Sequence, residues 1–388
     1  MAGTPVGARS ARRRAAPRGG VATARSTRDA RAIAPPVLVE VQREGIVESR
    51  HRGHIVQVGA DGRVERGVGD PEVLVTLRSA VKPFTLVALI ESGAADGLRL
   101  SDAELAVMAA SHGGEDLHVR TLQGVFRRAG LSQNLLACGA ENMPLDALTA
   151  ARLARDGEDP GPIRHMCSGF HAASIMLSRH AGWSLDDYHD PDHPSQVAAR
   201  GAVARVFGVS PATLRTAVDG CGLLTYAFPL VEVARAFALL ADPLGAAPDA
   251  GRALVAPALT RIRDAMMAHP ELVGGTRDMV DTVLMKALPR RVVIKGGAEA
   301  LRGVGLLPGS RGDRMPAGGM AVKIEDGDGF GRANRAATVE ALAQLGVVSE
   351  RELRLLARHH RPPVRDPRGE LTGEAVPGFE LAPISELV

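Results

Sequence analysis

The sequence predicts an α+β fold, in which strands from both ends of the chain form one antiparallel sheet beside a layer or lobe of helices. Apolar and polar residues alternate in a strand-like pattern within residues 37–58. Residues 79–289 instead place apolar residues at helical spacing, and strand patterns return over residues 291–324. Because helices separate the two strand regions in the sequence, we expect the fold to bring distant strands side by side.

The individual elements follow in chain order. We expect the first strands at residues 37–41 and 55–58, with Asp61-Gly62 as a turn before Val64. Helical periodicity predicts central helices at residues 84–92, 102–110, 117–129, 172–180, 196–207, 231–240, 252–268 and 277–287. Later strands are predicted at residues 291–295, 301–307 and 320–324, and two further helices at 332–345 and 350–358. The Pro-rich end is expected to return to the sheet.

The basic character of the chain is concentrated at its start. The chain has 47 Lys and Arg against 44 Asp and Glu, and its pI is about 9.0. Residues 1–34 hold eight Arg and one acidic residue, so this segment carries a net charge of +7 and the remainder −4. We therefore predict a disordered basic tail over residues 1–34, a domain over 35–388, and no nucleic-acid partner.

Composition excludes several other classes of protein. Hydrophobic residues make up 45% and charged residues 23%, which is typical of a globular protein. Aromatic residues make up only 3%, too few for a base-stacking surface. No apolar run approaches the ~20 residues that a membrane helix needs, and three Cys indicate a reducing compartment. The sequence thus predicts a cytoplasmic protein with no membrane partner.

Lysine is rare in this chain, and its few positions are informative. Only Lys82, Lys286, Lys295 and Lys323 occur among the 47 basic residues, and the other 43 are Arg. Arg cannot lose its proton in a protein, so a position that must deprotonate cannot use it. The remaining lysines are therefore candidates for chemistry, although Lys286 reads as a helix-end surface residue.

The first candidate motif is Ser79-Ala80-Val81-Lys82, which is followed by Pro83. Ser is a favoured N-cap and Pro is tolerated in a first turn, so we expect a helix to begin here. A spacing of three residues places the hydroxyl and the amine on one helix face. A deprotonated Lys82 accepts the Ser79 proton in this arrangement, as in acyl-transfer enzymes with S-x-x-K. The alternative is a capping serine with a solvated lysine.

Two glycine-rich segments carry further polar groups. The sequence SHGGE at residues 111–115 ends a predicted helix and is a candidate oxyanion or substrate loop. The alternative is a helix C-cap followed by a new helix at Glu115. Lys295-Gly296-Gly297 ends a predicted strand, where penicillin-interacting enzymes place K-T-G beside the nucleophile. Backbone N–H groups near Ser79 or Gly113 are expected to form an oxyanion hole.

Two of the three cysteines are candidate metal ligands. Cys167 lies in CSGFH and Cys221 in DGCG, and thiolates with a neighbouring His are candidate zinc ligands. The alternative is that these cysteines are small buried residues, as we expect for Cys138.

Taken in order, the motifs resemble the thermolabile-type (type II, rhizobial-like) L-asparaginase family. The matching stretches are ESRHRG at residues 48–53, RSAVKP at 78–83, SHGGE at 111–115, CSGFHA at 167–172, DGCGLLTYAFPL at 219–230, KGGAEA at 295–300 and VKIEDG at 322–327. This resemblance implies a fold similar to serine β-lactamases and glutaminases. It implies hydrolysis of the side-chain amide of L-asparagine to L-aspartate and ammonia, without an organic cofactor, and by analogy a homodimer.

The resemblance also implies roles for individual residues. Ser79 with Lys82 and Ser111 with Lys295 would form two catalytic pairs, in which Ser79 attacks the amide and Ser111 relays protons. The implied substrate contacts are Arg78, Glu115, His171 and Asp219. The implied metal is zinc, held by Cys167, Cys221 and a Lys.

Phe170 departs from this family pattern. It stands where the family has the Lys of C-S-G-K-H, and a phenyl ring can neither ligate a metal nor transfer a proton. Two alternatives therefore stay open beside an asparaginase: a hydrolase of another amide or of β-lactams, and a catalytically impaired relative that binds amino acids.

Overall fold

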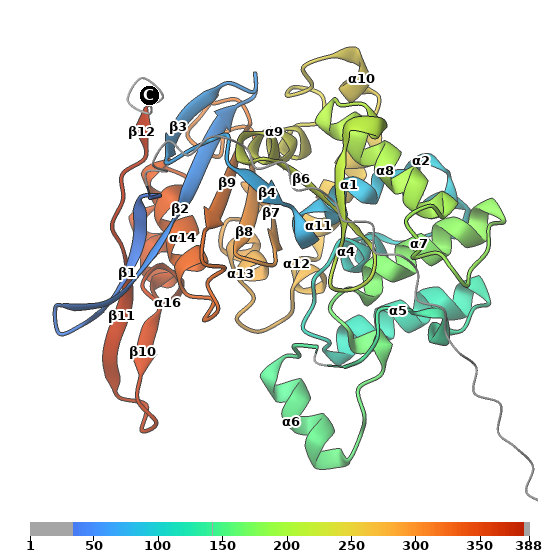
Figure 1. The fold of residues 1–388 in the computed structure, drawn as a ribbon, viewed down its shortest axis with the longest axis horizontal. Coiled ribbons are helices and arrows are strands. Elements are labelled where there is room, and N and C mark those ends of the chain that lie inside the picture. Colours follow the sequence, from blue (N-terminus) through green and yellow to red (C-terminus); the bar gives the residue numbers. More distant parts are fainter. Residues whose placement is uncertain (1–33, 142, 384–388) are drawn as a thin grey trace, which may run out of the picture. The chain divides into compact units, whose positions relative to one another are not determined.

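The computed structural model describes residues 34–141 and 143–383 of the 388-residue chain. The predicted basic tail lies outside these ranges except for Ala34. From Pro35 onward the chain forms one unit, in which a strand-rich part adjoins a helix-rich part (Figure 1). Within the two described ranges, no helix combines the length and apolar character needed to cross a membrane.

The main sheet is built from strands at both ends of the chain, which confirms the predicted α+β fold. Its strands run in the order β10-β11-β1-β2-β9-β8-β7, with β3 beside β2 and β12 beside β3. All these pairings are antiparallel among the described residues. The strands are β1 (Val37–Arg43), β2 (Ile46–Gly59), β3 (Val64–Val68), β7 (Val292–Gly297), β8 (Leu301–Leu306), β9 (Gly318–Ile324), β10 (Pro363–Arg365), β11 (Leu371–Pro377) and β12 (Ala382–Pro383).

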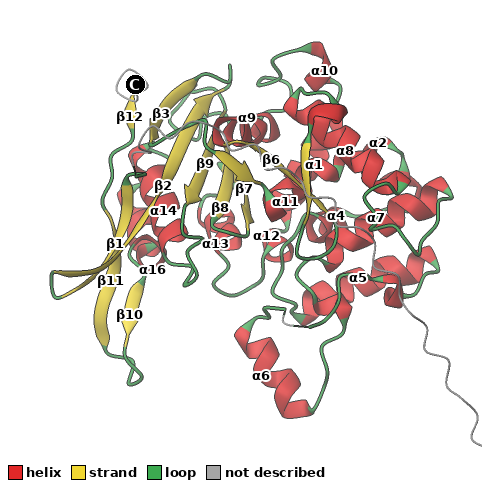
Figure 2. Cartoon of the chain, in the orientation of Figure 1, coloured by secondary structure: helices red, strands yellow, loops and turns green. Residues whose placement is uncertain are grey.

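Helices fill most of the chain between the two groups of strands (Figure 2). The 3₁₀-helices are η1 (Arg78–Val81), η2 (Gln133–Leu135), η3 (Pro162–Arg164) and η4 (Pro211–Thr213). The first α-helices are α1 (Lys82–Thr85), α2 (Val87–Glu91), α3 (Ala94–Gly97), α4 (Asp102–Met108), α5 (Asp116–Ala129), α6 (Ala147–Asp156), α7 (Ser168–Ala181) and α8 (Pro194–Phe207). The later ones are α9 (Leu230–Ala241), α10 (Ala250–Ala253), α11 (Ala256–Ala268), α12 (Pro270–Val273), α13 (Val280–Ala287), α14 (Ala333–Gln344), α15 (Glu350–Leu355) and α16 (Ala357–His360).

A second, three-stranded sheet is also present, and two of its strands lie within residues 79–289, where the sequence predicts only helices. Its order is β4-β6-β5, with β4 (Leu74–Thr76), β5 (Arg215–Val218) and β6 (Leu224–Pro229). The strand β6 reads LTYAFP, in which Thr, Tyr and Phe favour a strand, but six residues are too few for periodicity to decide. Leu77 N donates to Tyr226 O at 2.8 Å, so this small sheet holds the start of η1.

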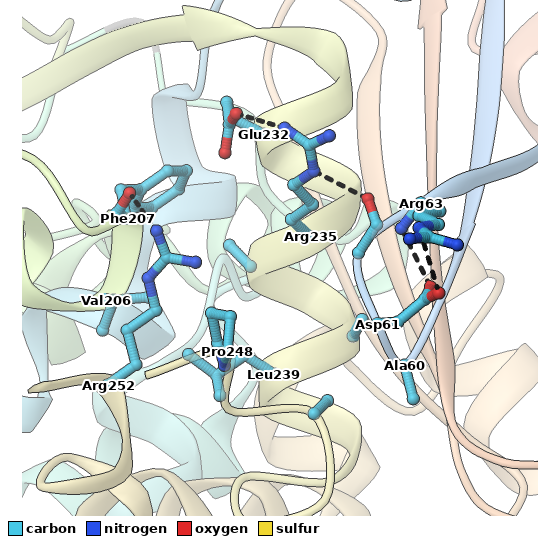
Figure 3. Close-up of a pocket in the computed structure, with 14 residues that line it drawn as sticks. Ala60, Asp61, Arg63, Val206, Phe207, Glu232, Arg235, Leu239, Pro248 and Arg252 are labelled. Atoms are coloured by element: carbon cyan, nitrogen blue, oxygen red, sulfur yellow. Dashed lines mark hydrogen bonds and ion pairs between the residues drawn. The ribbon is translucent and has the colours of Figure 1, made fainter. Parts of the chain in front are cut away.

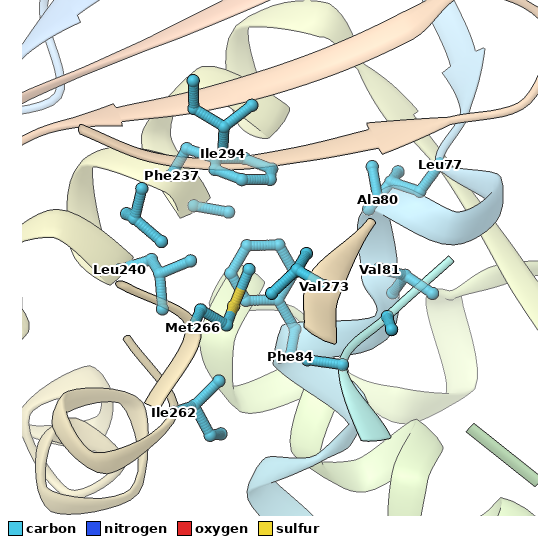
Figure 4. Packing of buried hydrophobic residues seen from close by; sticks show 14 of the residues in the cluster. Leu77, Ala80, Val81, Phe84, Phe237, Leu240, Ile262, Met266, Val273 and Ile294 are labelled. Carbon is cyan, nitrogen blue, oxygen red and sulfur yellow. The ribbon is translucent and has the colours of Figure 1, made fainter. Parts of the chain in front are cut away.

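The core fixes the segment that follows η1. Helix α9 packs on β2, β8 and β9, and Gly319 permits the approach because a Cβ there would lie 1.9 Å from Ala234 O. The Phe84 ring meets the Phe237 ring of α9 edge-on, with centroids 5.3 Å apart (Figure 4). Phe84 belongs to α1, as does Lys82. Burial of this aromatic pair therefore also fixes the helix that carries Lys82.

Candidate active site

A cavity of about 340 Å³ lies beside the end of β7 and contains three of the candidate catalytic residues. Ser79, Ser111 and Lys295 line it, together with residues of α13, the segment after β9 and the start of α14. This volume is within the range of small-molecule sites. The cavity therefore defines the candidate active site.

Ser111 follows α4, and its hydroxyl group contacts two lysines. Lys82 Nζ lies 3.1 Å from Ser111 Oγ, and Lys295 Nζ lies 2.9 Å from the same oxygen. Each lysine is only 1% exposed, so little water weakens these contacts. The fold thus brings one hydroxyl and two amines together from three distant segments.

Lys82 has a partner for each of its three ammonium hydrogens. Besides Ser111 Oγ, it donates to Ala110 O at 2.6 Å and to Cys167 Sγ at 3.2 Å. No hydrogen bond between Lys82 and Ser79 Oγ is present in the described structure, so the expected contact within this pair is not made. The contact is absent because buried acceptors from other segments already take up the hydrogen bonds of the Lys82 side chain.

Ser79 lies within a 3₁₀-helix rather than at a helix cap. Helix η1 spans Arg78–Val81 and α1 begins at Lys82, so the expected N-cap at Ser79 is wrong. The solvated lysine of the alternative reading is wrong too, because Lys82 is buried. Gly297 of β7 packs against η1, since a Cβ on it would lie 2.4 Å from Leu77 O. This close approach keeps Ser79 next to the strand that carries Lys295.

Lys295 has a different environment from that of Lys82. It donates to Ser111 Oγ and to Gly296 O, and its Nζ lies 3.9 Å from Asp281 Oδ2. Burial, and next the charge of Lys82, hold the pKa of Lys295 well below its ordinary value of 10.5. A lysine whose neutral form is accessible can act as a proton acceptor.

Asp281 and Arg302 belong to the site but were not found from the sequence. The guanidinium of Arg302 pairs with Asp281 Oδ1, and Gly296 N donates to Asp281 Oδ2 at 2.8 Å. Both residues line the cavity. The Arg302 guanidinium therefore balances the charge of Asp281, so this carboxylate has less electrostatic effect on Lys295. Their positions 21 residues apart, on α13 and β8, form no local motif.

The segment after α4 is held by backbone hydrogen bonds to the end of α12. Ser111 N donates to Val273 O at 3.0 Å, and Gly113 N donates to Gly274 O at 2.8 Å. The Gly113 N–H is therefore already engaged, contrary to its expected role as an oxyanion donor. As the alternative reading has it, a new helix, α5, starts after Glu115.

Glu115 is bound by the loop before α13. Its carboxylate accepts Thr276 N at 2.7 Å and Thr276 Oγ1 at 2.5 Å, and Arg277 Nη2 lies 3.3 Å away. Glu115 does not line the cavity. Glu115, which the resemblance implies as a substrate contact, therefore anchors this loop instead.

The other implied substrate contacts also lie outside the cavity lining. Arg78 Nε donates to Asp219 Oδ1 at 2.6 Å, so these two residues are paired with each other. Fully buried His171 contacts the Tyr188 hydroxyl through Nδ1 at 2.6 Å. Burial lowers the pKa of His171 to about 3, so this ring is neutral near pH 7.

Cys167 and Cys221 lie together, as the implied zinc site requires. The hydrogen bond from the Cys221 thiol holds the pKa of Cys167 well below its ordinary value, and the same contact raises the pKa of Cys221. Phe170 provides no third donor, and its ring centroid lies 5.5 Å from Lys82 Nζ. In the described ranges, no three His, Cys, Asp or Glu side chains are placed to share a metal. These residues therefore do not fit zinc, and Lys82 donates a hydrogen bond to the Cys167 sulfur instead.

Another cavity, of about 230 Å³, is lined by residues of α8, α9, the turn between β2 and β3, and the segment after α9. In it Arg235 donates to Gly62 O and contacts Glu232, while Arg252 donates to Phe207 O (Figure 3). None of the candidate catalytic residues lines this cavity. The positions of the candidate catalytic residues therefore favour the cavity beside Ser111 as the active site.

A sequence profile of the L-asparaginase II family matches residues 39–377, which is most of the chain and includes every residue of the site described above. The chain belongs to the L-asparaginase II family. This assignment supports an amidohydrolase. A search of curated protein sequences finds no significant match.

Solved structures resemble the chain remotely. Mglu is 16% identical, with a TM-score of 0.36 over 76% of this chain and 68% of that one. A probable glutaminase from Bacillus subtilis, complexed with 6-diazo-5-oxo-L-norleucine, is 11% identical, with a TM-score of 0.39 over 76% of this chain and 84% of that one. The family assignment does not depend on these likenesses.

Proposed function

We propose that this member of the L-asparaginase II family hydrolyses the side-chain amide of L-asparagine, giving L-aspartate and ammonia. The observation that carries the proposal is the placement of Ser111 Oγ between two buried lysine amines at a cavity wall. A hydroxyl beside a base and a fixed cation is the arrangement that nucleophilic amide hydrolysis needs. Because Lys82 contacts Ser111 and not Ser79, we assign the attack to Ser111.

In the first half-reaction, neutral Lys295 accepts the Ser111 proton while Oγ attacks the amide carbon. Lys82, which donates to the same oxygen, stabilises the negative charge that develops on Oγ. The new Lys295 ammonium then gives its proton to the amide nitrogen. The C–N bond breaks, ammonia leaves, and the aspartyl group remains as an ester on Ser111.

In the second half-reaction, water attacks this ester. Lys295 accepts the proton of the water and returns it to Ser111 Oγ, so aspartate leaves and the enzyme is restored. We assign to Ser79, which lines the same cavity, a hydrogen bond to the substrate amide. Its N–H is the remaining candidate for an oxyanion donor, since Gly113 N–H is engaged.

We assign recognition of the zwitterionic substrate in part to Arg78 and Asp219. They lie outside the cavity lining, but Arg78 is adjacent in η1 to Ser79, which lines it. The two residues carry opposite charges, as the α-carboxylate and α-ammonium groups do. Substrate would exchange the ion pair between them for two ion pairs of its own. Glu115 and His171 support this site from outside the cavity.

The test is ammonia release from L-asparagine by the wild-type protein and by Ser111→Ala. Loss of a nucleophile lowers kcat by more than about a thousandfold. Ser92→Ala, at an exposed helix end, is the matched control and keeps wild-type activity. Equal rates for Ser111→Ala and the wild type would exclude the mechanism.

Glutamine, β-aspartyl compounds and a chromogenic cephalosporin complete the substrate panel. Turnover of one of these without turnover of asparagine would identify a different amide or β-lactam hydrolase. Thermal stabilisation by asparagine without any turnover would identify the amino-acid-binding relative that Phe170 suggests.

A further inference from the structure

A second cavity, of about 490 Å³, adjoins the active-site cavity. Asp278, Gly331 and Arg335 line both cavities, so the two are contiguous at these residues. Asparagine is a small molecule, and the reacting groups Ser111 and Lys295 line the first cavity only. The second cavity is therefore space that hydrolysis of asparagine alone does not require.

The lining of the second cavity is strongly basic. It contains four arginines, Arg332, Arg335, Arg358 and Arg365, and one carboxylate, Asp278. A net charge of this sign in a hollow concentrates anions and disfavours cations. The apolar remainder includes Phe330, Pro362 just before β10, and Pro363 and Val364 within β10.

Asp278 engages only part of this positive charge. Arg335 Nη1 and Arg358 Nη2 each lie 3.3 Å from its carboxylate, and His359 Nε2 lies 3.7 Å away. Asp278 has a φ of +50°, a conformation rarely adopted by residues other than glycine, so the surrounding contacts hold it in place. The acidic residue thus sits at the junction between the two cavities.

The guanidinium groups of the other two arginines, Arg332 and Arg365, pair with no carboxylate within residues 34–141 and 143–383. The Arg332 guanidinium stacks on the Phe330 ring at 4.7 Å and donates to His51 Nε2 and Ser49 Oγ, each at 3.3 Å. Arg365 donates to Gly369 O at 2.7 Å. Guanidinium groups that no carboxylate pairs with keep their positive charge and further N–H donors for a ligand.

We infer that this second cavity is a subsite for a further carboxylate of the substrate, so that the enzyme prefers amides larger than asparagine that carry one. The inference rests on the proposed amidohydrolase function. Arg332 and Arg365 would bind the carboxylate, while Ser111 and Lys295 act on the amide in the first cavity. The reaction is unchanged: water adds to the carbonyl carbon, the C–N bond breaks, and the amine leaves with the proton.

Two substrates place the carboxylate on different sides of the scissile amide. In β-aspartyl-glycine it belongs to the leaving amine, and glycine is released. In asparaginyl-glycine it belongs to the acyl side, and ammonia is released. Each is compared with a neutral counterpart in which ethanolamine replaces glycine.

The experiment measures kcat/KM for both pairs and for asparagine, with the wild type, Arg365→Gln, Arg332→Gln and the control Arg354→Gln. Arg354 is exposed and does not line either cavity of the active site. We expect the carboxylate form of one pair to exceed its neutral form about tenfold, the value of one charged hydrogen bond. This preference should fall in the Arg332 and Arg365 variants, and remain in the control.

The outcomes separate this inference from the proposed function. Asparagine hydrolysis with no carboxylate preference in either pair overturns the subsite and leaves the proposed function standing. No hydrolysis of any substrate overturns the proposed function. Calorimetric binding to Ser111→Ala then tests the subsite without turnover: tighter binding of the carboxylate form supports it, and equal binding overturns it.

Discussion

The two sides of the active site each bring a lysine to Ser111, but in different surroundings. On the helical side, Lys82 donates three hydrogen bonds, which only an ammonium group can do, and a phenyl ring and a thiol adjoin it. On the strand side, Lys295 has only two such neighbours, Ser111 Oγ and Gly296 O, so a neutral amine can donate to Gly296 O and accept the Ser111 hydroxyl proton. The difference indicates a division of roles, with Lys82 as the fixed cation and Lys295 as the base.

Replacement of each lysine by arginine should separate these roles, with the largest expected effect. Arginine keeps the charge but cannot release its proton. Lys295→Arg should therefore lose as much activity as Lys295→Met, about a thousandfold or more. Lys82→Arg should retain more activity than Lys82→Met. Ammonia release measures the effect, and circular dichroism checks folding; equal rescue by arginine at both positions would contradict the division.

Arg302 should control the pH at which the strand side works. Without its guanidinium, the Asp281 carboxylate would stabilise the ammonium form of Lys295 at 3.9 Å. We expect Arg302→Met to move the acidic limb of the kcat/KM profile to higher pH by about one unit. The double variant Asp281→Asn/Arg302→Met should move it back. An unchanged profile in Arg302→Met would show that Asp281 does not act on Lys295.

The lowered pKa of Lys295 should also appear in the stability of the protein. Between this lowered pKa and the ordinary value of 10.5, the unfolded state binds more protons than the folded state. Stability should therefore rise with pH across this window. Lys295→Met should flatten this rise and increase the free energy of unfolding near neutral pH. Urea unfolding at several pH values gives the measurement, and a wild-type slope retained in the variant would rule out Lys295 as its source.

We expect zinc to bind at the two cysteines on the helical side only after Phe170 is replaced. The wild-type site offers two thiols and no third donor, so we expect little zinc after dialysis. Phe170→Lys restores the family motif and should raise the bound zinc per chain, with Phe170→Leu as the control. Elemental analysis measures the metal. Stoichiometric zinc in the wild type would show that other donors complete the site.

The sequence predicted the sheet and the residues that meet in the candidate site better than it predicted how they pair. Strand patterns at both ends placed the sheet, and scarcity of lysine pointed to Lys82 and Lys295. The Ser79–Lys82 spacing suggested a local pair, but the acceptors of Lys82 lie on segments 28 to 85 residues away. Asp281 and Arg302 likewise meet only in the folded chain. Contacts of this kind depend on tertiary packing, which periodicity and motifs do not report.

Covalent labelling tests the central assignment, Ser111 as the nucleophile between two lysines, most directly. The probe is a diazoketone analogue of asparagine, and peptide mass spectrometry locates the label. Our account predicts one label per chain on the peptide that contains Ser111, abolished by Ser111→Ala and by Lys295→Met. A label on Ser79 that persists in Ser111→Ala would contradict it.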